Sequence, residues 1–148
     1  MNNLQNVKVV NVTTPAAIVD NASFSTTTID TFGFNKLAVY FQLGATDIAM
    51  TALKLQESDD SGMSGAADIT GAVYGASGAP SLPSATDDNK IFGFFIDLKG
   101  RKRYIDVVAT AGDGSTGTYG ACTAHLYNGN ATTDDATERG LAANLIVG

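Results

Sequence analysis

The 148-residue sequence has almost none of the side chains that cross-link a fold or hold a metal. It contains one cysteine (Cys122), one histidine (His125) and no tryptophan. A single cysteine excludes a disulfide within the chain, and no CxxC or Cys/His cluster suits a structural zinc site. We therefore expect no cofactor and no metal, and we expect packing or assembly to stabilise the protein.

Charged residues are also scarce. They make up 16% of the chain, and the formal net charge is -6, whereas about 25% is usual for globular proteins. This acidity argues against DNA or RNA as a partner, because nucleic-acid binding depends on neutralising phosphates. Residues 1–8 lack a basic leader, and no apolar run approaches the length of a bilayer span. We therefore expect no membrane partner and folding in a cytoplasm.

The sequence does contain a strong β pattern. Apolar and polar residues alternate between clusters of Gly, Asp, Asn and Ser, and helix signals are nearly absent. The fold class we predict is all-β: a jelly-roll-like antiparallel β-sandwich of about eight short strands. One domain is expected over residues 22–127, after an N-terminal strand or arm at 1–21. The expected strands are residues 7–12, 26–31, 36–43, 52–58, 69–74, 90–98, 102–111 and 118–127.

The apolar face of each strand predicts the hydrophobic core. Two Gly-rich turns, around Lys99-Gly100 and over residues 112–117, are predicted to close hairpins, and residues 75–89 are predicted to form a long surface loop. We expect the following side chains to meet in one core: Leu37, Val39, Phe41, Leu53, Leu55, Phe92, Phe94, Ile96, Ile105 and Val107.

The C-terminal segment, residues 128–148, departs from this pattern. It is polar as far as Arg139 and apolar from Leu141 to Val147. Two interpretations stay open: a final strand or short helix docked on the same chain, or an arm that packs on a neighbouring subunit. Its candidate contact residues are Leu141, Leu145, Ile146 and Val147.

Cys122 and His125 are the residues to consider for nucleophilic catalysis. An odd separation along a strand sends two side chains to opposite faces, so we expect Cys122 in the core, His125 outside, and no dyad. Residues 112–117 match G-x-G-x-x-G, but a nucleotide site needs a helix directly after that motif, and a strand follows here. We expect the protein not to be an enzyme.

Lys99, Arg101, Lys102 and Arg103 form a basic cluster in an otherwise acidic chain. One interpretation is a solvated turn with Tyr104 stacked beside it. Another is a contact patch for an acidic protein partner. Nucleic acid ranks third, because one cluster without interleaved aromatic residues is a weak footprint.

Three segments resemble small structural proteins of tailed-bacteriophage heads, the decoration or cement proteins. They are Asp30-Thr31-Phe32-Gly33-Phe34 with the strand after it, Leu53-Lys54-Leu55-Gln56-Glu57-Ser58-Asp59-Asp60, and Gly100-Arg101-Lys102-Arg103-Tyr104-Ile105-Asp106-Val107. The resemblance covers roughly residues 30–127. It implies a jelly-roll-like sandwich that assembles, often as a trimer, on the outside of an icosahedral shell and clamps neighbouring capsid subunits. It offers no catalytic residues to carry over.

We therefore expect a structural virion protein on the outer capsid surface, assembled in the host cytoplasm. Its expected partners are the major capsid protein and further copies of itself, most simply as a homotrimer. The alternative is a fibre or tail-associated domain that binds a receptor or glycan in a groove lined by exposed Tyr40, Tyr74 or Tyr127. The absence of tryptophan disfavours a free-standing carbohydrate-binding module.

Overall fold

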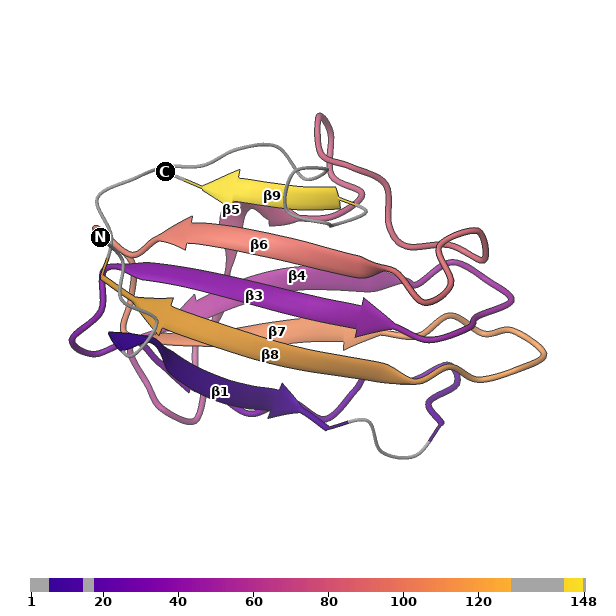
Figure 1. The fold of residues 1–148 in the computed structure, drawn as a ribbon, viewed down its shortest axis with the longest axis horizontal. Helices are drawn as coiled ribbons and strands as arrows, with labels where there is room; N and C mark the ends of the chain where they lie inside the picture. Colours follow the sequence, from indigo (N-terminus) through magenta and orange to yellow (C-terminus); the bar gives the residue numbers. More distant parts are fainter. Residues whose placement is uncertain (1–5, 15–17, 129–142, 148) are drawn as a thin grey trace.

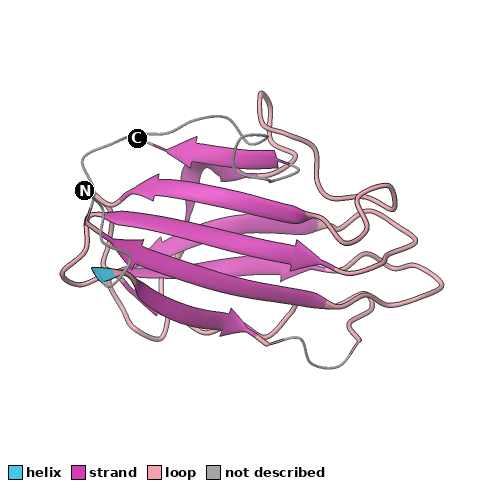
Figure 2. Cartoon of the chain, in the orientation of Figure 1, coloured by secondary structure: helices cyan, strands magenta, loops and turns pink. Residues whose placement is uncertain are grey.

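A computed structural model describes residues 6–14, 18–128 and 143–147 of the chain. Apart from one helical residue, Asn6, this part of the protein consists of strands joined by loops (Figure 2). No helix in it is long and apolar enough to cross a membrane. The strands are β1 (Lys8–Thr13), β2 (Ile29–Asp30), β3 (Lys36–Leu43), β4 (Ala52–Ser58), β5 (Ala67–Val73), β6 (Ile91–Asp97), β7 (Tyr104–Thr110), β8 (Gly120–Tyr127) and β9 (Ala143–Val147).

The strands form two sheets that pack face to face (Figure 1). One sheet has the order β1-β8-β3-β6-β9 and the other has the order β2-β7-β4-β5. Neighbouring strands are antiparallel, except that β9 lies parallel to β6. The predicted all-β sandwich is confirmed, with the addition of a parallel ninth strand at one edge.

The first eight strands pair as the two arms of one long rolled-up hairpin. β1 pairs with β8, β2 with β7, β3 with β6, and β4 with β5. This pairing is the jelly-roll connectivity, in which most consecutive strands lie in opposite sheets. Among these eight strands, β4 and β5 are the one consecutive pair that shares a sheet.

Two predicted hairpins are therefore wrong. β6 and β7 belong to different sheets, so the turn at Lys99-Gly100 crosses from one layer to the other. The loop at residues 112–117 also crosses, because β7 and β8 lie in opposite sheets. A turn signal shows that the chain changes direction, but strand alternation does not reveal which sheet the next strand joins.

The core lies between the two sheets, where their inward-facing side chains interlock. All ten predicted core residues are buried there, each 3% exposed or less. Burial alternates strictly along β7 and β8, as expected for strands with one face in the core and one face outside. The sequence pattern therefore located the inward face of each of these strands correctly.

β9 answers part of the question left open for the C-terminal segment. It docks on β6 of the same chain, with Leu145 opposite Phe94 and Ile146 opposite Phe95. Leu145 and Val147 are 8% exposed and belong to the core. Of the proposed contact residues, Leu141 lies outside the described residues. The described residues of both ends, in β1 and β9, are thus part of one sandwich.

Candidate functional site

The two residues considered for catalysis lie on opposite faces of β8. Cys122 is in the core, and burial raises the pKa of its thiol to about 12. His125 is on the outer face, where its ring meets Tyr40 edge-on at 5.3 Å and partial burial lowers its pKa. A protonated thiol that faces away from the imidazole cannot be activated by it, so this pair does not form a dyad.

The G-x-G-x-x-G segment is a structural crossing between β7 and β8. Asp47 Oδ2 accepts hydrogen bonds from the backbone N–H groups of Ser115 at 2.7 Å and Thr116 at 3.1 Å. A Cβ atom at Gly112 would collide with the carbonyl of Ala49. The glycines thus allow this loop to pack closely, and a strand follows it. No group of three or more potential metal ligands occurs within the part of the chain that the structure describes.

The predicted basic cluster lies at the end of the sandwich where β6 and β8 end and β3 begins, at the left of Figure 1. Much of its charge is neutralised within the chain. Arg101 Nη1 lies 3.5 Å from Glu57 Oε1, and Lys102 Nζ lies 3.6 Å from Asp59 Oδ2. The backbone N–H of Lys102 also donates to Glu57 Oε2 at 3.2 Å. Lys99 Nζ forms no ion pair with a carboxylate of the described residues, but the Lys99 backbone N–H donates to Asp97 Oδ1 at 3.0 Å.

Arg103 makes the best-formed ion pair of the cluster. Its Nε and Nη2 atoms donate to the two carboxylate oxygens of Asp30, each at 2.8 Å. This bidentate bond is the main cause that lowers the pKa of Asp30 to about 2. The Arg103 guanidinium also lies over two aromatic rings, 4.9 Å from the centroid of Phe32 and 5.1 Å from that of Tyr104. Tyr104 therefore stacks beside the cluster as predicted.

Phe32 is the most exposed large hydrophobic side chain of the described residues, at 74%. It belongs to the turn between β2 and β3, where Gly33 has a φ of +88°. Phe32 lies in the first of the three segments that resemble decoration proteins, but it was not among the predicted contact residues. Its position in a turn, outside the strand alternation and next to a glycine, is the signal that could have found it.

The turn that carries Phe32 is fixed at several points. The backbone N–H and the hydroxyl of Thr31 both donate to the Arg103 carbonyl, at 3.1 and 2.7 Å. The Phe32 N–H donates to Asp30 Oδ1 at 3.1 Å. From the end of β8, Asn128 Oδ1 accepts from the Asn35 N–H at 3.0 Å. An exposed phenylalanine is thus mounted on a well-ordered turn.

The opposite end of the sandwich also exposes apolar side chains. Ile18, Ile48 and Tyr119 are 53%, 41% and 49% exposed. They are grouped around the 112–117 crossing, because Gly117 packs against Ile18, Gly112 packs against Ile48, and the Gly44 N–H donates to the Tyr119 carbonyl at 2.8 Å. The loops after β3 and β7 meet at this end, at the right of Figure 1.

The charges of this second end are mostly negative. The exposed carboxylates on its loops belong to Asp20, Asp47, Asp88 and Asp113. Lys90 is the one lysine in the sequence of these loops, and it forms an ion pair with Asp87 at 3.1 Å. The two ends of the molecule therefore differ in charge, although both present apolar side chains.

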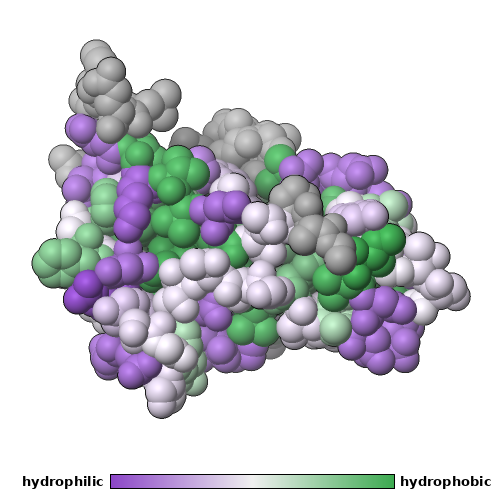
Figure 3. Space-filling view, turned by 90° about the horizontal axis from the view of Figure 1, so that it is seen from below, coloured by the Kyte–Doolittle hydropathy of each residue, from purple (hydrophilic) through white to green (hydrophobic). Residues whose placement is uncertain are grey.

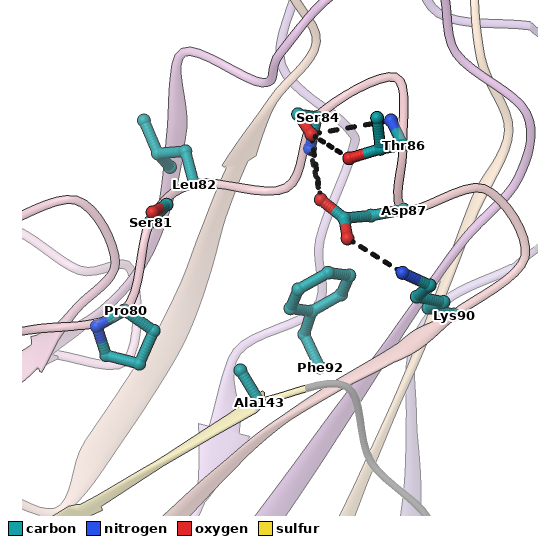
Figure 4. A pocket seen from close by; sticks show the side chains of 9 residues that line it. All are labelled: Pro80, Ser81, Leu82, Ser84, Thr86, Asp87, Lys90, Phe92 and Ala143. Carbon is teal, nitrogen blue, oxygen red and sulfur yellow. Dashed lines mark hydrogen bonds and ion pairs between the residues drawn. The ribbon is translucent and has the colours of Figure 1, made fainter.

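A pocket of about 610 Å³ lies beside the start of β6 and β9 (Figure 4). Its polar side chains bind one another: Ser84 Oγ donates to Asp87 Oδ2 at 2.9 Å, and Lys90 Nζ donates to Asp87 Oδ1 at 3.1 Å. Hydrogen bonds from Ser84, chiefly from its backbone N–H, and from Lys90 lower the pKa of Asp87. Phe92 lines the pocket but is only 3% exposed, so its ring offers little area for stacking.

A second pocket, of about 500 Å³, lies at the end of β1, and Thr13, Ser23, Phe24 and Thr27 are among the residues that line it. Figure 3 views the molecule from below, where described hydrophobic residues form patches between hydrophilic ones.

Comparison with known proteins gives no independent identification. No protein-family model matches the chain. No curated protein sequence matches it either.

Proposed function

We propose that this chain is a capsid decoration, or cement, protein. In this function it binds the outside of an icosahedral phage head, contacts the major capsid protein, and bridges neighbouring capsid subunits. Its place is the outer surface of the virion, reached after synthesis in the host cytoplasm. It acts by binding alone, without a cofactor and without a catalysed reaction.

The observation that carries this proposal is the presence of exposed apolar side chains at both ends of one rigid sandwich. Phe32 stands at one end, and Ile18, Ile48 and Tyr119 stand at the other. A protein that bridges two subunits needs at least two separate contact surfaces, and its body must be stiff enough to transmit force between them. The jelly-roll core supplies such a body, and it is also the fold that the resemblance over residues 30–127 implies.

Self-association is part of the proposal. A homotrimer places several copies of each end on the same shell, so that weak contacts add up through multivalency. The low charge content of the chain suits broad protein contacts, because few ions have to be desolvated when surfaces meet.

The test is redecoration of bare shells. The protein is stripped from purified heads and added back, and the thermal rupture of bare and redecorated shells is compared. We expect the protein to rebind and to raise the rupture temperature. An unrelated acidic β-sandwich protein of similar size serves as the control. Failure to rebind, or rebinding without a change in rupture temperature, contradicts the proposed function.

The alternative is a fibre or tail-associated domain that binds a receptor or glycan. The pocket in Figure 4 favours it in one respect, because hydroxyl, carboxylate and ammonium groups gather there. The alternative also predicts a groove of exposed tyrosines, and this expectation is wrong for Tyr74. Tyr74 is 2% exposed in the core and cannot contact a ligand. Binding to a glycan array, lost in Asp87→Ala, would establish this alternative.

A further inference from the structure

We propose that Phe32, held in place by Arg103, is the anchor of the basic end on its partner. The ring inserts into an apolar pocket of the capsid protein, and that pocket carries acidic side chains at its rim. This inference rests on the proposed function and identifies the residue and the partner chemistry at one of its two contact surfaces.

Phe32 leaves most of its ring in water. A phenylalanine that is 74% exposed contributes little to folding beyond its contact with the Arg103 guanidinium, 4.9 Å from the ring centroid. Burial in a partner pocket would remove nearly the whole ring from water. Aromatic rings and arginine are enriched among the few residues that dominate binding energy at protein interfaces.

The turn that carries Phe32 is already ordered before any partner binds. The Thr31, Phe32 and Asn35 N–H groups are bonded to acceptors in the chain, at distances of 3.0 to 3.1 Å. Asn128 Nδ2 also donates to the Gly33 carbonyl at 3.3 Å. A turn that is fixed before binding loses little conformational entropy on binding, which increases the affinity that one side chain can supply.

Arg103 keeps hydrogen-bond donors that its own chain does not use. Asp30 engages its Nε and Nη2 atoms, whereas Nη1 has no hydrogen bond to another described residue. The guanidinium thus fixes Phe32 on one side and still offers donors to a partner carboxylate or carbonyl. Because its side chain is 48% exposed, these donors are within reach of a surface that receives Phe32.

Two lysines lie around the turn that carries Phe32. Lys8 lies near enough to Asp30 to contribute to the lowering of its pKa, and the Leu98 N–H donates to the Asn35 carbonyl at 3.0 Å, which sets Lys99 beside the same turn. Lys99 also lies near Asp97, whose pKa is lowered chiefly by Lys36 and further by Lys99. Neither ammonium group forms an ion pair with a carboxylate of the described ranges, and both lysines are exposed. Two exposed cations around Phe32 fit a partner pocket with an acidic rim.

The experiment measures binding of purified variants to stripped shells by co-sedimentation. Phe32→Ala is the principal variant, and Val9→Ala, on β1 and outside both proposed contact surfaces, is the control for loss of one exposed apolar side chain. Phe32→Leu retains an apolar side chain. Arg103→Lys retains the positive charge but loses the bidentate bond to Asp30. Thermal melting of each variant reports folding separately.

We expect Phe32→Ala to weaken binding at least about tenfold, with a melting temperature within about 2 °C of the wild type. Phe32→Leu should retain more affinity than Phe32→Ala, and Arg103→Lys should fall between the wild type and Phe32→Ala. Val9→Ala should leave binding unchanged.

The two proposals fail in different ways. If the wild type binds shells and Phe32→Ala binds equally well, the anchor is wrong and the proposed function stands. If Phe32→Ala and Val9→Ala are equally weakened, Phe32 has no special role and the anchor is again wrong. If the wild type does not bind shells at all, the proposed function falls, and the anchor falls with it.

Discussion

The hydroxyl of Tyr74, directly after β5, donates a 2.9 Å hydrogen bond to the carbonyl of Gly93 in β6 of the facing sheet. The Tyr74 ring also meets Phe92 and Phe94 edge-on, with centroids 5.8 and 5.2 Å away. This residue therefore joins the two sheets by a polar bond within an apolar region, and a buried hydroxyl of this kind needs its partner.

Tyr74→Phe keeps the ring and removes only the hydroxyl. We expect the free energy of unfolding to fall by about 1 kcal/mol, because the Gly93 carbonyl loses a partner inside the core. Urea denaturation measures the change. Tyr119→Phe is the control, since Tyr119 is 49% exposed and should show almost no effect. Equal effects in both variants would contradict a structural role for the bond.

Alkaline pH should destabilise the protein through two buried groups. Burial raises the pKa of Tyr74 and raises that of Cys122 to about 12, whereas the unfolded chain ionises cysteine near pH ~8.5 and tyrosine near pH ~10. Raised folded-state pKa values mean that the stabilisation is complete below about pH 8.5 and is lost as the pH rises.

The measurement is the unfolding free energy from about pH 8 to pH 11. In the wild type it should decline across this range, and Cys122→Ala should remove the part of the decline that begins near pH ~8.5. Tyr74→Phe should flatten the part above pH ~10. A wild-type curve that stays level to about pH 11 would show that neither group is shielded from solvent.

The contrast between two phenylalanines tests the core directly. Phe94 is fully buried, so Phe94→Ala should lower the unfolding free energy by about 3–5 kcal/mol. Phe32→Ala removes the same ring from an exposed site and should change stability by less than about 0.5 kcal/mol. Thermal or urea denaturation compares the two. A Phe94→Ala protein that melts like the wild type would mean that this strand faces the wrong way.

Strands and their inward faces could be predicted because alternation is a local property. β3 and β4 have the predicted bounds, residues 36–43 and 52–58, since each runs without interruption between turn signals. β2 is only two residues long, although Thr26 to Thr31 has high β propensity. Pairing with β7 covers only Ile29 and Asp30, so tertiary contact and not propensity sets its length.

The connections and the surroundings of Phe32 could not be predicted in the same way. Whether β7 returns beside β6 or crosses to β4 depends on contacts far apart in sequence, and the Lys99-Gly100 turn allows both. The pairing of Arg103 with Asp30 links residues 73 positions apart. The position of Phe32 between two strands and next to a glycine is a local sign of exposure, but only the structure shows the Arg103 guanidinium over its ring.

The position of Leu145 in β9 indicates how its substitution should affect stability. Because Leu145 packs on β6 of its own chain, Leu145→Ala should lower the unfolding free energy by about 2 kcal/mol. Light scattering should find a trimer both for the wild type and for the variant. Val9→Ala, on the opposite edge strand and 61% exposed, is the control and should leave stability unchanged.

Light scattering also separates the two interpretations of this segment. Loss of the trimer in Leu145→Ala would indicate that β9 is exchanged between subunits and does not dock at home. A wild type that stays monomeric at high micromolar concentration would contradict the homotrimer itself.

Salt should separate the two components of binding at the basic end. Lys8 and Lys99 are exposed and form no ion pair with another described residue, so their attraction to an acidic rim is screened as ionic strength rises. Burial of the Phe32 ring does not depend on ion pairing and should persist. We therefore expect the affinity for stripped shells to fall between about 0.05 M and 0.5 M salt and then to reach a constant residual affinity.

Lys99→Gln should reduce this salt dependence while leaving the high-salt affinity unchanged, whereas Phe32→Ala should lower the affinity at every salt concentration. Co-sedimentation across the salt series provides the measurement. If the affinity of the wild type does not change with salt, the lysines do not face an acidic surface, and the basic end binds through its apolar residues alone.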